Sequence, residues 1–424
     1  MNDVHGGIAV LIVAYGRPDL LSDCLRSCRV HLGDLPVHVW DNSELDHPGM
    51  SEVRASYPAV NWHGTGVNLG FAAAVNRLAD LVPGAHMLLL NPDAIVSGAL
   101  VRTRAQLTAD TTVAAAAPRI AAATPYPGEM PWFNAHRAPN LLRALVSRAG
   151  YAPALSGRSI SELYRTPPTE VDGYLTGACL LINRRAWNAV GAFDEEFFLY
   201  GEEADWQLRV RSSGWRLIFV DEPGITHSAK GTVVGDQQRS LRSDDLLRAN
   251  IALTLEHAKG ARTADLYLAG TSLLDHLQRS ARRVRKARIR RDTGQPQVIL
   301  TMDRLADGDA QRQRVLLAIE LDRRGYFVTI ACMRRLGPLV AEIPPTVRVV
   351  RQPWWCPVFD LGEGPAILVS GDTLAEIRCA ALWRPFGRSR RVIAPNMRRC
   401  LEGTADMKTM ADSYEEALIA VLKD

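Results

Sequence analysis

The residues of this sequence best placed for chemistry are carboxylates that directly follow short apolar runs. Asp93 comes soon after the run 87–90, and Asp41 ends the run 37–40. Pro92 has no N–H to donate to a sheet, so a strand should end before it and leave Asp93 at its carboxyl end. Ligands bind at that edge of open α/β sheets, where a carboxylate can hold a divalent cation that binds diphosphate. The alternative at both positions is a turn after a strand.

A strand–helix–strand unit is expected to position Asp41. The apolar run 8–14 predicts a strand, Pro18 suits a helix start, and apolar residues from Leu20 to Cys28 recur at helical spacing. The run 37–40 is the second strand of this right-handed βαβ unit. An acid after that strand can accept hydrogen bonds from a base or ribose. The sequence has no GxGxxG and no P-loop motif.

A glycine- and alanine-rich stretch follows a short expected strand at residues 60–63. Gly66 and Gly70 permit tight turns, and the alanines after Phe71 let a helix pack closely on the sheet. The start of such a helix can receive phosphate through its free N–H groups.

In chain order, the motifs IVAYGRPDLLSDCLRSC, VWDNS, NLGFAAAVN and LLLNPDAIV resemble family 2 of the inverting glycosyltransferases, which have the GT-A fold. The most similar branch includes rhamnosyltransferases and related enzymes of polysaccharide biosynthesis. The resemblance covers residues 7–235. It implies transfer of a sugar from a nucleotide diphosphate donor to an acceptor hydroxyl on a glycan, a lipid or a small molecule. It also favours a deoxythymidine-diphosphate rhamnose donor.

The resemblance also implies roles for individual residues. Those matching the family's nucleotide- and donor-binding positions are Ala14, Tyr15, Arg17, Asp41, Asn68, Gly70, Phe71 and Asn76. The family's metal motif, often Asp-x-Asp, is Asn91-Pro92-Asp93 here, so Asp93 is the expected ligand of Mg²⁺ or Mn²⁺ and Asn91 lies beside the donor. A strand is expected at residues 217–220, and His227 after it matches a histidine that contacts metal or diphosphate. The alternative is a surface histidine.

The block GEEADW matches the family's proposed catalytic base, which is usually an aspartate. Glu203 occupies the base position, with Glu202 and Asp205 beside it. The alternative is structural, because acidic residues stabilise a helix start and Asp205 can pair with Arg209. We expect that helix to begin at about Asp205 and to end at Gly214.

The middle of the chain is expected to face the acceptor. Residues 124–168 show weak periodicity and predict a long binding loop, in which Trp132, His136 and Arg137 could touch a sugar. In the stretch 171–181, Asp172 and the small residues around Gly177 suggest backbone close to ligand.

The last third predicts a second domain. Eight of the thirteen residues in 279–291 are Lys or Arg, which indicates either contact with anionic lipid or a solvated linker. Strands and helices alternate again after Pro296, as in the acceptor-side half of a GT-B glycosyltransferase. We therefore predict a GT-A domain at 1–240, a helical and basic linker at 241–295 and a smaller Rossmann-like α/β domain at 296–424. The last domain is expected to bind an acceptor, a partner or a second copy of the chain.

Composition limits the remaining classes of function. The chain has 424 residues, 47% of them hydrophobic, and a net charge of +4. Seven scattered cysteines, no signal peptide and no membrane-spanning run predict a cytoplasmic protein, with peripheral contact at the inner face of the membrane as an extension of the basic segment. Nucleic-acid binding is not expected, because the basic segment lacks interleaved aromatics. The main alternative function is a non-catalytic scaffold that binds nucleotide sugars.

Overall fold

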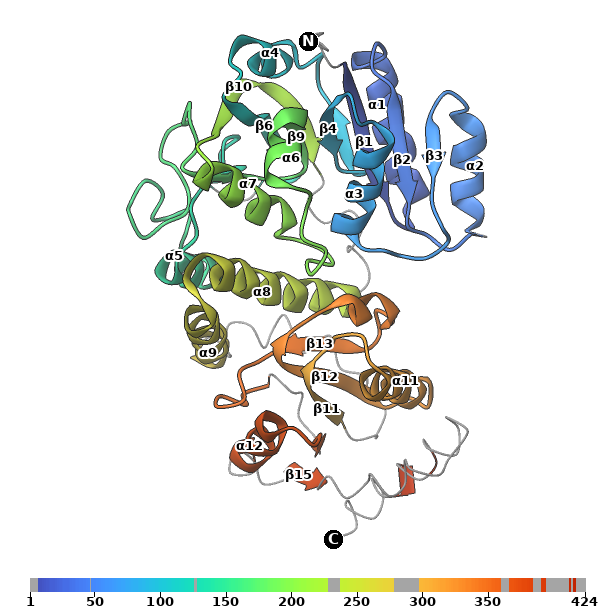
Figure 1. Ribbon diagram of the computed structural model, residues 1–424, viewed down its shortest axis with the longest axis vertical. Coiled ribbons are helices and arrows are strands. Elements are labelled where there is room, and N and C mark those ends of the chain that lie inside the picture. Colours follow the sequence, from blue (N-terminus) through green and yellow to red (C-terminus); the bar gives the residue numbers. More distant parts are fainter. Residues whose placement is uncertain are drawn as a thin grey trace. The chain divides into compact units, whose positions relative to one another are not determined.

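The structure is a computed structural model that describes residues 7–45, 47–125, 128–227, 237–277, 297–359, 366–383 and 390–393, together with 412, 415 and 416. The chain divides into two compact units, Met1–Val234 and Gly235–Asp424. Each unit has its own central sheet and its own helices (Figure 1). The predicted boundaries at 240 and 295 stay predictions, and the basic segment 279–291 lies outside the described residues.

An eight-stranded mixed sheet forms the centre of the first unit, in the order β3-β2-β1-β4-β9-β6-β10-β5. The strands are Ile8–Ala14 (β1), Val37–Asp41 (β2), Asn61–His63 (β3), His86–Leu90 (β4), Ala94–Val96 (β5), Val113–Ala122 (β6), Cys179–Ile182 (β9) and Arg216–His227 (β10). β1 pairs in parallel with β2 and β4, whereas β9 runs antiparallel to β4 and β6. The predicted mixed α/β fold is confirmed for this unit.

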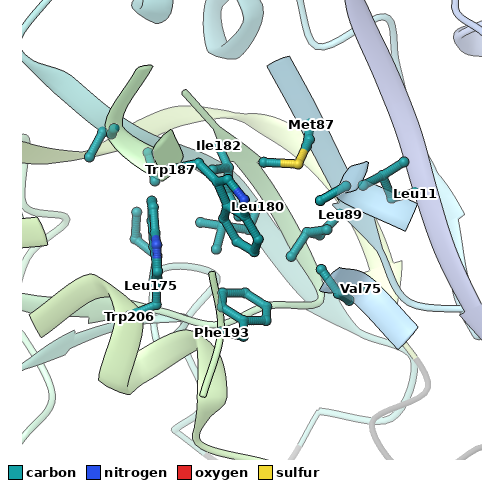
Figure 2. Packing of buried hydrophobic residues seen from close by; sticks show 14 of the residues in the cluster. Leu11, Val75, Met87, Leu89, Leu175, Leu180, Ile182, Trp187, Phe193 and Trp206 are labelled. Carbon is teal, nitrogen blue, oxygen red and sulfur yellow. The ribbon is translucent and has the colours of Figure 1, made fainter. Parts of the chain in front are cut away.

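Helices cover both faces of this sheet because successive strand residues point to opposite sides. The helices are Pro18–His31 (α1), Pro48–Ser56 (α2), Phe71–Leu81 (α3), Val101–Ala109 (α4), Arg184–Val190 (α6) and Glu202–Ser212 (α7). Leu11 of β1 belongs to the core with α3, α6 and α7, whereas Ile12 belongs to the core with α1, α2 and α4. Figure 2 shows the first of these cores, where Trp187, Phe193 and Trp206 pack against one another.

The sequence places His227 after a strand at 217–220, and this expectation is wrong because β10 continues to His227. Pro223 is accommodated by shifts in the register between β10 and β6 on both sides of it, as β-bulges allow. The end of β10 then pairs with β5, with His227 opposite Ala94. This pairing brings His227 next to the residue that precedes Ala94.

The expectation of a loop without regular structure at 124–168 is also wrong. The described part of this segment contains strand Ala135–Arg137 (β7) and helix Leu141–Arg148 (α5). β7 pairs with Gly173–Leu175 (β8) in a separate two-stranded sheet. The Asn140 side chain caps α5 by accepting the N–H of Arg143. A strand of three residues and a helix of eight residues are too short to produce a clear periodicity in the sequence.

The second unit has a five-stranded parallel sheet in the order β13-β12-β11-β14-β15. Its strands are Gln297–Arg304 (β11), Phe327–Arg335 (β12), Arg348–Arg351 (β13), Ala366–Val369 (β14) and Arg390–Ile393 (β15). Its helices are Gln237–Lys259 (α8), Ala261–Leu277 (α9), Asp309–Arg323 (α11) and Leu374–Trp383 (α12), with the 3₁₀ helix Pro338–Glu342 (η2). This confirms a second, smaller α/β unit, and its likeness to half of a GT-B enzyme stays a prediction. No helix in the described ranges is long and apolar enough to cross a bilayer.

Candidate active site

The carboxyl ends of β4 and β10 bring three predicted site residues together. Nε2 of His227 lies 3.0 Å from Oδ1 of Asp93 and 3.1 Å from the side-chain nitrogen of Asn91. Backbone hydrogen bonds hold Asn91 in place: its N–H donates to Ala178 O, and its carbonyl accepts the N–H of Ala94. Asp93 is only 7% exposed. The cluster is therefore a fixed, largely desolvated set of polar groups at the ligand edge of the sheet.

These three groups fit a divalent metal ion. A carboxylate is a ligand for both Mg²⁺ and Mn²⁺, and imidazole nitrogen suits transition metals better. The oxygen and nitrogen of the Asn91 amide are assigned from hydrogen bonding alone, so turning the amide by 180° presents its oxygen to His227 and Asp93. Asp93, His227 and Asn91 could then all coordinate one ion.

Asp41, at the end of β2, is held by the loop that follows β1. Its Oδ1 accepts the N–H of Ser43 at 2.9 Å, and the Ser43 hydroxyl oxygen accepts the N–H of Gly16 at 2.9 Å. Its Oδ2 lies 3.3 Å from the guanidinium of Arg54 on α2. The carboxylate is thus oriented by the backbone, and its second oxygen meets only a half-exposed arginine.

The other predicted residues of the first loop differ in their contacts and in their exposure to solvent. The Ala14 carbonyl accepts the N–H of Asn42, which ties the ends of β1 and β2 together. Tyr15 is exposed and could stack on a base. The Arg17 guanidinium donates two hydrogen bonds to Asp19, which raises the pKa of Arg17 and lowers that of Asp19.

Asn42 connects this loop to the glycine-rich turn before α3. Its side-chain nitrogen donates to Gly70 O at 3.0 Å, and its side-chain oxygen accepts the N–H of Leu69 at 3.2 Å. The Asn68 side chain accepts the N–H of Gly70 at 3.0 Å. Gly70, which the resemblance places at the donor, is therefore held by both Asn68 and Asn42, and Asn42 is not among the site residues predicted from the sequence.

The start of α3 is locked against the segment before α7. Gly70 has φ +83°, and a Cβ there would lie 2.5 Å from Phe198 O. The next residue, Phe71, donates its N–H to the same carbonyl. On α3, the buried Asn76 donates to Phe193 O and accepts the N–H of Phe193. Both polar ends of the Asn76 amide are thus used in packing α3 against this segment.

Two adjacent carboxyl groups at the start of α7 have different surroundings. Glu202 is 3% exposed, and its Oε2 has no hydrogen-bond partner among the residues that the structure describes. Glu203 is half-buried and accepts the N–H of Gly201 at 3.2 Å. A Cβ on Gly177 would stand 3.4 Å from Cγ of Glu203, so the glycine backbone lies directly against this side chain.

The two carboxyls are expected to differ in charge. Burial and the neighbouring charge of Glu203 raise the pKa of Glu202 well above its usual range. Burial also raises the pKa of Glu203, but backbone N–H groups of Glu203, Gly201 and Gly177 oppose that shift. When the pair holds one proton, these contacts favour that proton on Glu202 and the negative charge on Glu203.

The helix that carries these residues starts earlier than the sequence predicts, at Glu202 and not near Asp205. Tyr200 and Gly201 both have positive φ and turn the chain into the helix. Asp205 is buried and pairs with Arg209 at 2.9 Å, the i,i+4 interaction that an acidic helix start favours.

Residues 176–178 connect the base candidate to the strand-end cluster. Gly177 lies against Glu203, and Ala178 bonds to Asn91 through the backbone. From the sequence alone, Gly177 and Ala178 are expected only to be small residues near ligand. These two small residues lie in the sequence between the Asn91-Pro92-Asp93 motif and the GEEADW block, and that position is the signal that could have indicated the connection.

The remaining predicted residues lie elsewhere in this region. Asp172 is exposed and pairs with Arg211 at 2.7 Å. Trp132 donates its indole N–H to Tyr164 O, and the Arg137 guanidinium lies over the Tyr164 ring. These three residues have structural partners. His136 instead lines a cavity of about 400 Å³ whose wall also includes His227.

A family model described as "Glycosyltransferase like family 2" matches residues 5–242, which contain the strand ends, the α3 turn and the α7 carboxylates. The chain belongs to this family. Membership of this family and similarity to two rhamnosyltransferases support glycosyl transfer as the activity of this glycosyltransferase.

Two curated relatives are 30% identical to this glycosyltransferase over 241 residues, 54% of this chain and 76% of theirs. Both are N-acetylglucosaminyl-diphospho-decaprenol L-rhamnosyltransferases, from the Mycobacterium tuberculosis strains CDC 1551 / Oshkosh and ATCC 25618 / H37Rv.

Similar solved structures include TarS residues 1–349 from S. aureus, at 12% identity and a TM-score of 0.38, covering 66% of this chain and 74% of that fragment. Another is the mannosyltransferase PcManGT from Pyrobaculum calidifontis in complex with GDP-Man and Mn²⁺, at 14% identity and a TM-score of 0.41, covering 66% of this chain and 78% of PcManGT.

Proposed function

We propose that this chain is an inverting, metal-dependent glycosyltransferase that moves a sugar from a nucleotide diphosphate to an acceptor hydroxyl. The observation that carries the proposal is the connection of Glu203 through Gly177 and Ala178 to the Asn91–Asp93–His227 cluster. It joins a carboxylate to a set of groups suited to metal binding at the ligand edge of the sheet. That combination matches a base and a diphosphate site in one active centre.

Each group has a distinct role in this proposal. Asp41, oriented by Ser43, accepts hydrogen bonds from the nucleoside, and Tyr15 stacks on its base. Asn91, Asp93 and His227 hold a divalent ion, which neutralises charge on the diphosphate.

Glu203 accepts the proton of the acceptor hydroxyl. The hydroxyl oxygen then forms the new bond to the anomeric carbon, while the carbon–oxygen bond to the diphosphate breaks and its electron pair stays on the diphosphate. A single displacement of this kind inverts the anomeric configuration. Glu202, buried and protonated, lends a hydrogen bond to Glu203 and is not itself the base.

The relatives suggest the substrates. By similarity to the mycobacterial enzymes, we propose a deoxythymidine-diphosphate rhamnose donor and an acceptor with N-acetylglucosamine on a diphosphate lipid. The family resemblance of the sequence favours the same donor.

The test measures binding and transfer separately. Thermal stability of the full chain is recorded with deoxythymidine-, uridine- and guanosine-diphosphate sugars, each with and without Mn²⁺ or Mg²⁺. A ligand at 100 times its Kd should stabilise the folded state by about 2.7 kcal/mol, and the metal should be needed for that gain. Transfer to an N-acetylglucosaminyl-diphospho-lipid should give a product of inverted anomeric configuration by NMR. Binding without transfer or donor hydrolysis would favour the non-catalytic scaffold, and no binding at all would reject the proposal.

A further inference from the structure

The direction in which His227 points depends on an irregularity in the middle of β10. Val220 lies opposite Pro118 of β6, and Ile225 lies opposite Ile120. Five steps along β10 thus match two steps along β6, so β10 holds three extra residues between these pairs. Extra residues of this kind form β-bulges, which re-aim the side chains that follow them.

The number of extra residues is odd, and an odd number reverses the alternation of side chains along the strand. In an uninterrupted strand, side chains return to the same face every second residue. Val220 and Ile225 are five residues apart, yet both belong to the core with α1, α2 and α4. His227 follows Ile225 by two residues and therefore shares its face of the sheet. Without the reversal, Thr226 would take this face and His227 would point to the other side.

Glu222, one of the extra residues, anchors this bulge to the start of α4. Its carboxylate is buried, and Oε1 accepts both the backbone N–H of Thr103, at 2.5 Å, and the Thr103 hydroxyl. Oε2 accepts the backbone N–H of Arg102 at 3.2 Å. N–H groups in the first turn of a helix have no partner inside the helix, and the residue before α4 is Leu100, whose side chain does not cap it. Glu222 therefore caps α4 from another strand, where the helix dipole also favours its negative charge.

The other extra residues are fixed as well. The carbonyl of Asp221 accepts a hydrogen bond from the guanidinium of Arg102. The carbonyl of Gly224 accepts the N–H of Ser97, the residue after β5, at 2.9 Å. A Cβ on Gly224 would lie 2.6 Å from Arg119 O, so β6 passes directly against the glycine backbone. The bulge is thus attached to α4 on one side and to the end of β5 on the other.

We propose that Glu222 is a positioning residue for the metal-binding cluster. By capping α4 it holds the bulge whose three extra residues turn His227 toward Asp93. This inference rests on the proposed function, because it concerns how the proposed metal site is built. Glu222 acts through the strand and contacts neither metal nor substrate.

The first test needs no metal. In the full chain with ¹⁵N-labelled histidine, Asp93→Asn should shift the ring resonances of His227, because it changes the group 3.0 Å from Nε2. His227→Gln assigns these resonances. In a Glu222→Ala background, Asp93→Asn should shift them by less than a third as much, because the ring no longer faces Asp93. Equal shifts in the two backgrounds would overturn the proposal.

The second test measures Mn²⁺ binding by electron paramagnetic resonance of the free ion. Glu222→Ala should raise the Kd for Mn²⁺ at least tenfold. Asn140→Ala is the matched control, because it removes the cap that accepts the N–H of Arg143 in α5 and leaves the bulge untouched. Its Kd for Mn²⁺ should stay within twofold of wild type. Glu222→Gln keeps an oxygen for Thr103 and should restore the Kd to within threefold of wild type.

A wild-type Kd for Mn²⁺ in folded Glu222→Ala, or an equal loss in Asn140→Ala, would overturn the role of Glu222. If Glu222→Ala does not fold, Thr103→Val replaces it in both tests, because it removes only the hydroxyl that donates to Glu222. Thr103→Val should raise the Kd for Mn²⁺ two- to fivefold, and an unchanged Kd would contradict the proposal. A wild-type chain that binds no Mn²⁺ would overturn the proposed metal-dependent function, and the histidine spectra alone would then decide whether Glu222 places His227.

Discussion

Nε2 of His227, the last residue of β10, lies 3.0 Å from Oδ1 of Asp93, which follows β4. The two residues are brought together by the pairing of β10 with β5, whose first residue, Ala94, comes directly after Asp93. A carboxylate and an imidazole at this distance form a site that a divalent metal ion can enter between them.

Replacing Asp93 with asparagine should weaken metal binding and donor binding together. A neutral amide is a poorer ligand for a hard cation than a carboxylate of nearly the same shape. We expect kcat/KM to fall by roughly 100-fold, or about 2.7 kcal/mol. Titration of Mn²⁺ followed by donor calorimetry measures both effects. Full wild-type activity in excess chelator would contradict the role of this cluster.

Replacing Glu203 with glutamine should remove catalysis with little effect on donor affinity. The variant keeps the shape of the side chain but not its charge, and general-base contributions are typically about 100- to 10,000-fold in rate. Glu202→Gln is the matched control, because Glu202 is buried and protonated and should retain most activity. Separate assays of transfer and donor binding check this. A dead Glu202→Gln beside an active Glu203→Gln would mean that Glu202 is the base.

The protonated state of Glu202 predicts how stability depends on pH. Because its pKa is raised in the folded state, its stabilising contribution is complete below the pKa of the unfolded chain and is lost as pH rises through the folded pKa. Wild-type stability should therefore decline from the pKa of an unfolded glutamate, about 4.3, up to the raised folded pKa, by up to about 1.4 kcal/mol per pH unit for one proton. Glu202→Gln should flatten this decline in chemical denaturation between pH 4 and 8. An unchanged slope would show that Glu202 is already ionised.

A Cβ on Gly70 should be costly for two reasons. Gly70 has φ +83°, and the added carbon would lie 2.5 Å from Phe198 O. Gly214 has a similar φ of +86° but no atom within 4 Å of its Cβ position, so Gly214→Ala isolates the cost of the backbone conformation. We expect about 1 kcal/mol for Gly214→Ala and roughly 2–4 kcal/mol for Gly70→Ala. Equal losses in urea denaturation would show that the Phe198 contact relaxes freely.

Residues 1–234 should fold and bind donor without the rest of the chain, because they contain the whole eight-stranded sheet. A chain ending at Gly294 should aggregate more readily than the 1–234 fragment. It retains α8, which packs on β13 and pairs Asp245 with Arg348 of that strand. Without β13 these buried groups would face water. Light scattering and donor-induced thermal shifts compare the two; an insoluble 1–234 fragment beside a soluble 1–294 fragment would contradict the division.

The sequence predicts those parts of the fold that local patterns control. The run 8–14 is the strand Ile8–Ala14, and Pro92 lies just past the end of β4, where its missing N–H requires. The predicted strand at 217–220 is too short, because the bulges that let β10 continue past Pro223 depend on the neighbouring strand β6. The Asp93–His227 contact followed only from the resemblance, since 134 residues separate the pair along the chain.

The difference between Glu202 and Glu203 could not be predicted from their neighbouring positions. It depends on which carboxyl the interior encloses and which one the backbone of Gly177 approaches, and both are set by tertiary packing. The cavity of about 400 Å³ beside His227 could not be predicted either, because its lining combines β6, β7, α5 and the last residue of β10. No single stretch of sequence carries that pattern.

The position of β10 at the end of the first unit affects how the protein is made. During synthesis β6 and β5 leave the ribosome long before the strand that lies between them in the sheet. Until residues 216–227 emerge, each of these strands has one edge whose backbone N–H and C=O groups lack the neighbouring strand β10. Asp93 likewise lacks His227 beside it. The last of the three groups proposed to bind metal therefore joins the sheet only after residues 216–227 emerge, so a chain cut before His227 would lack part of that proposed site.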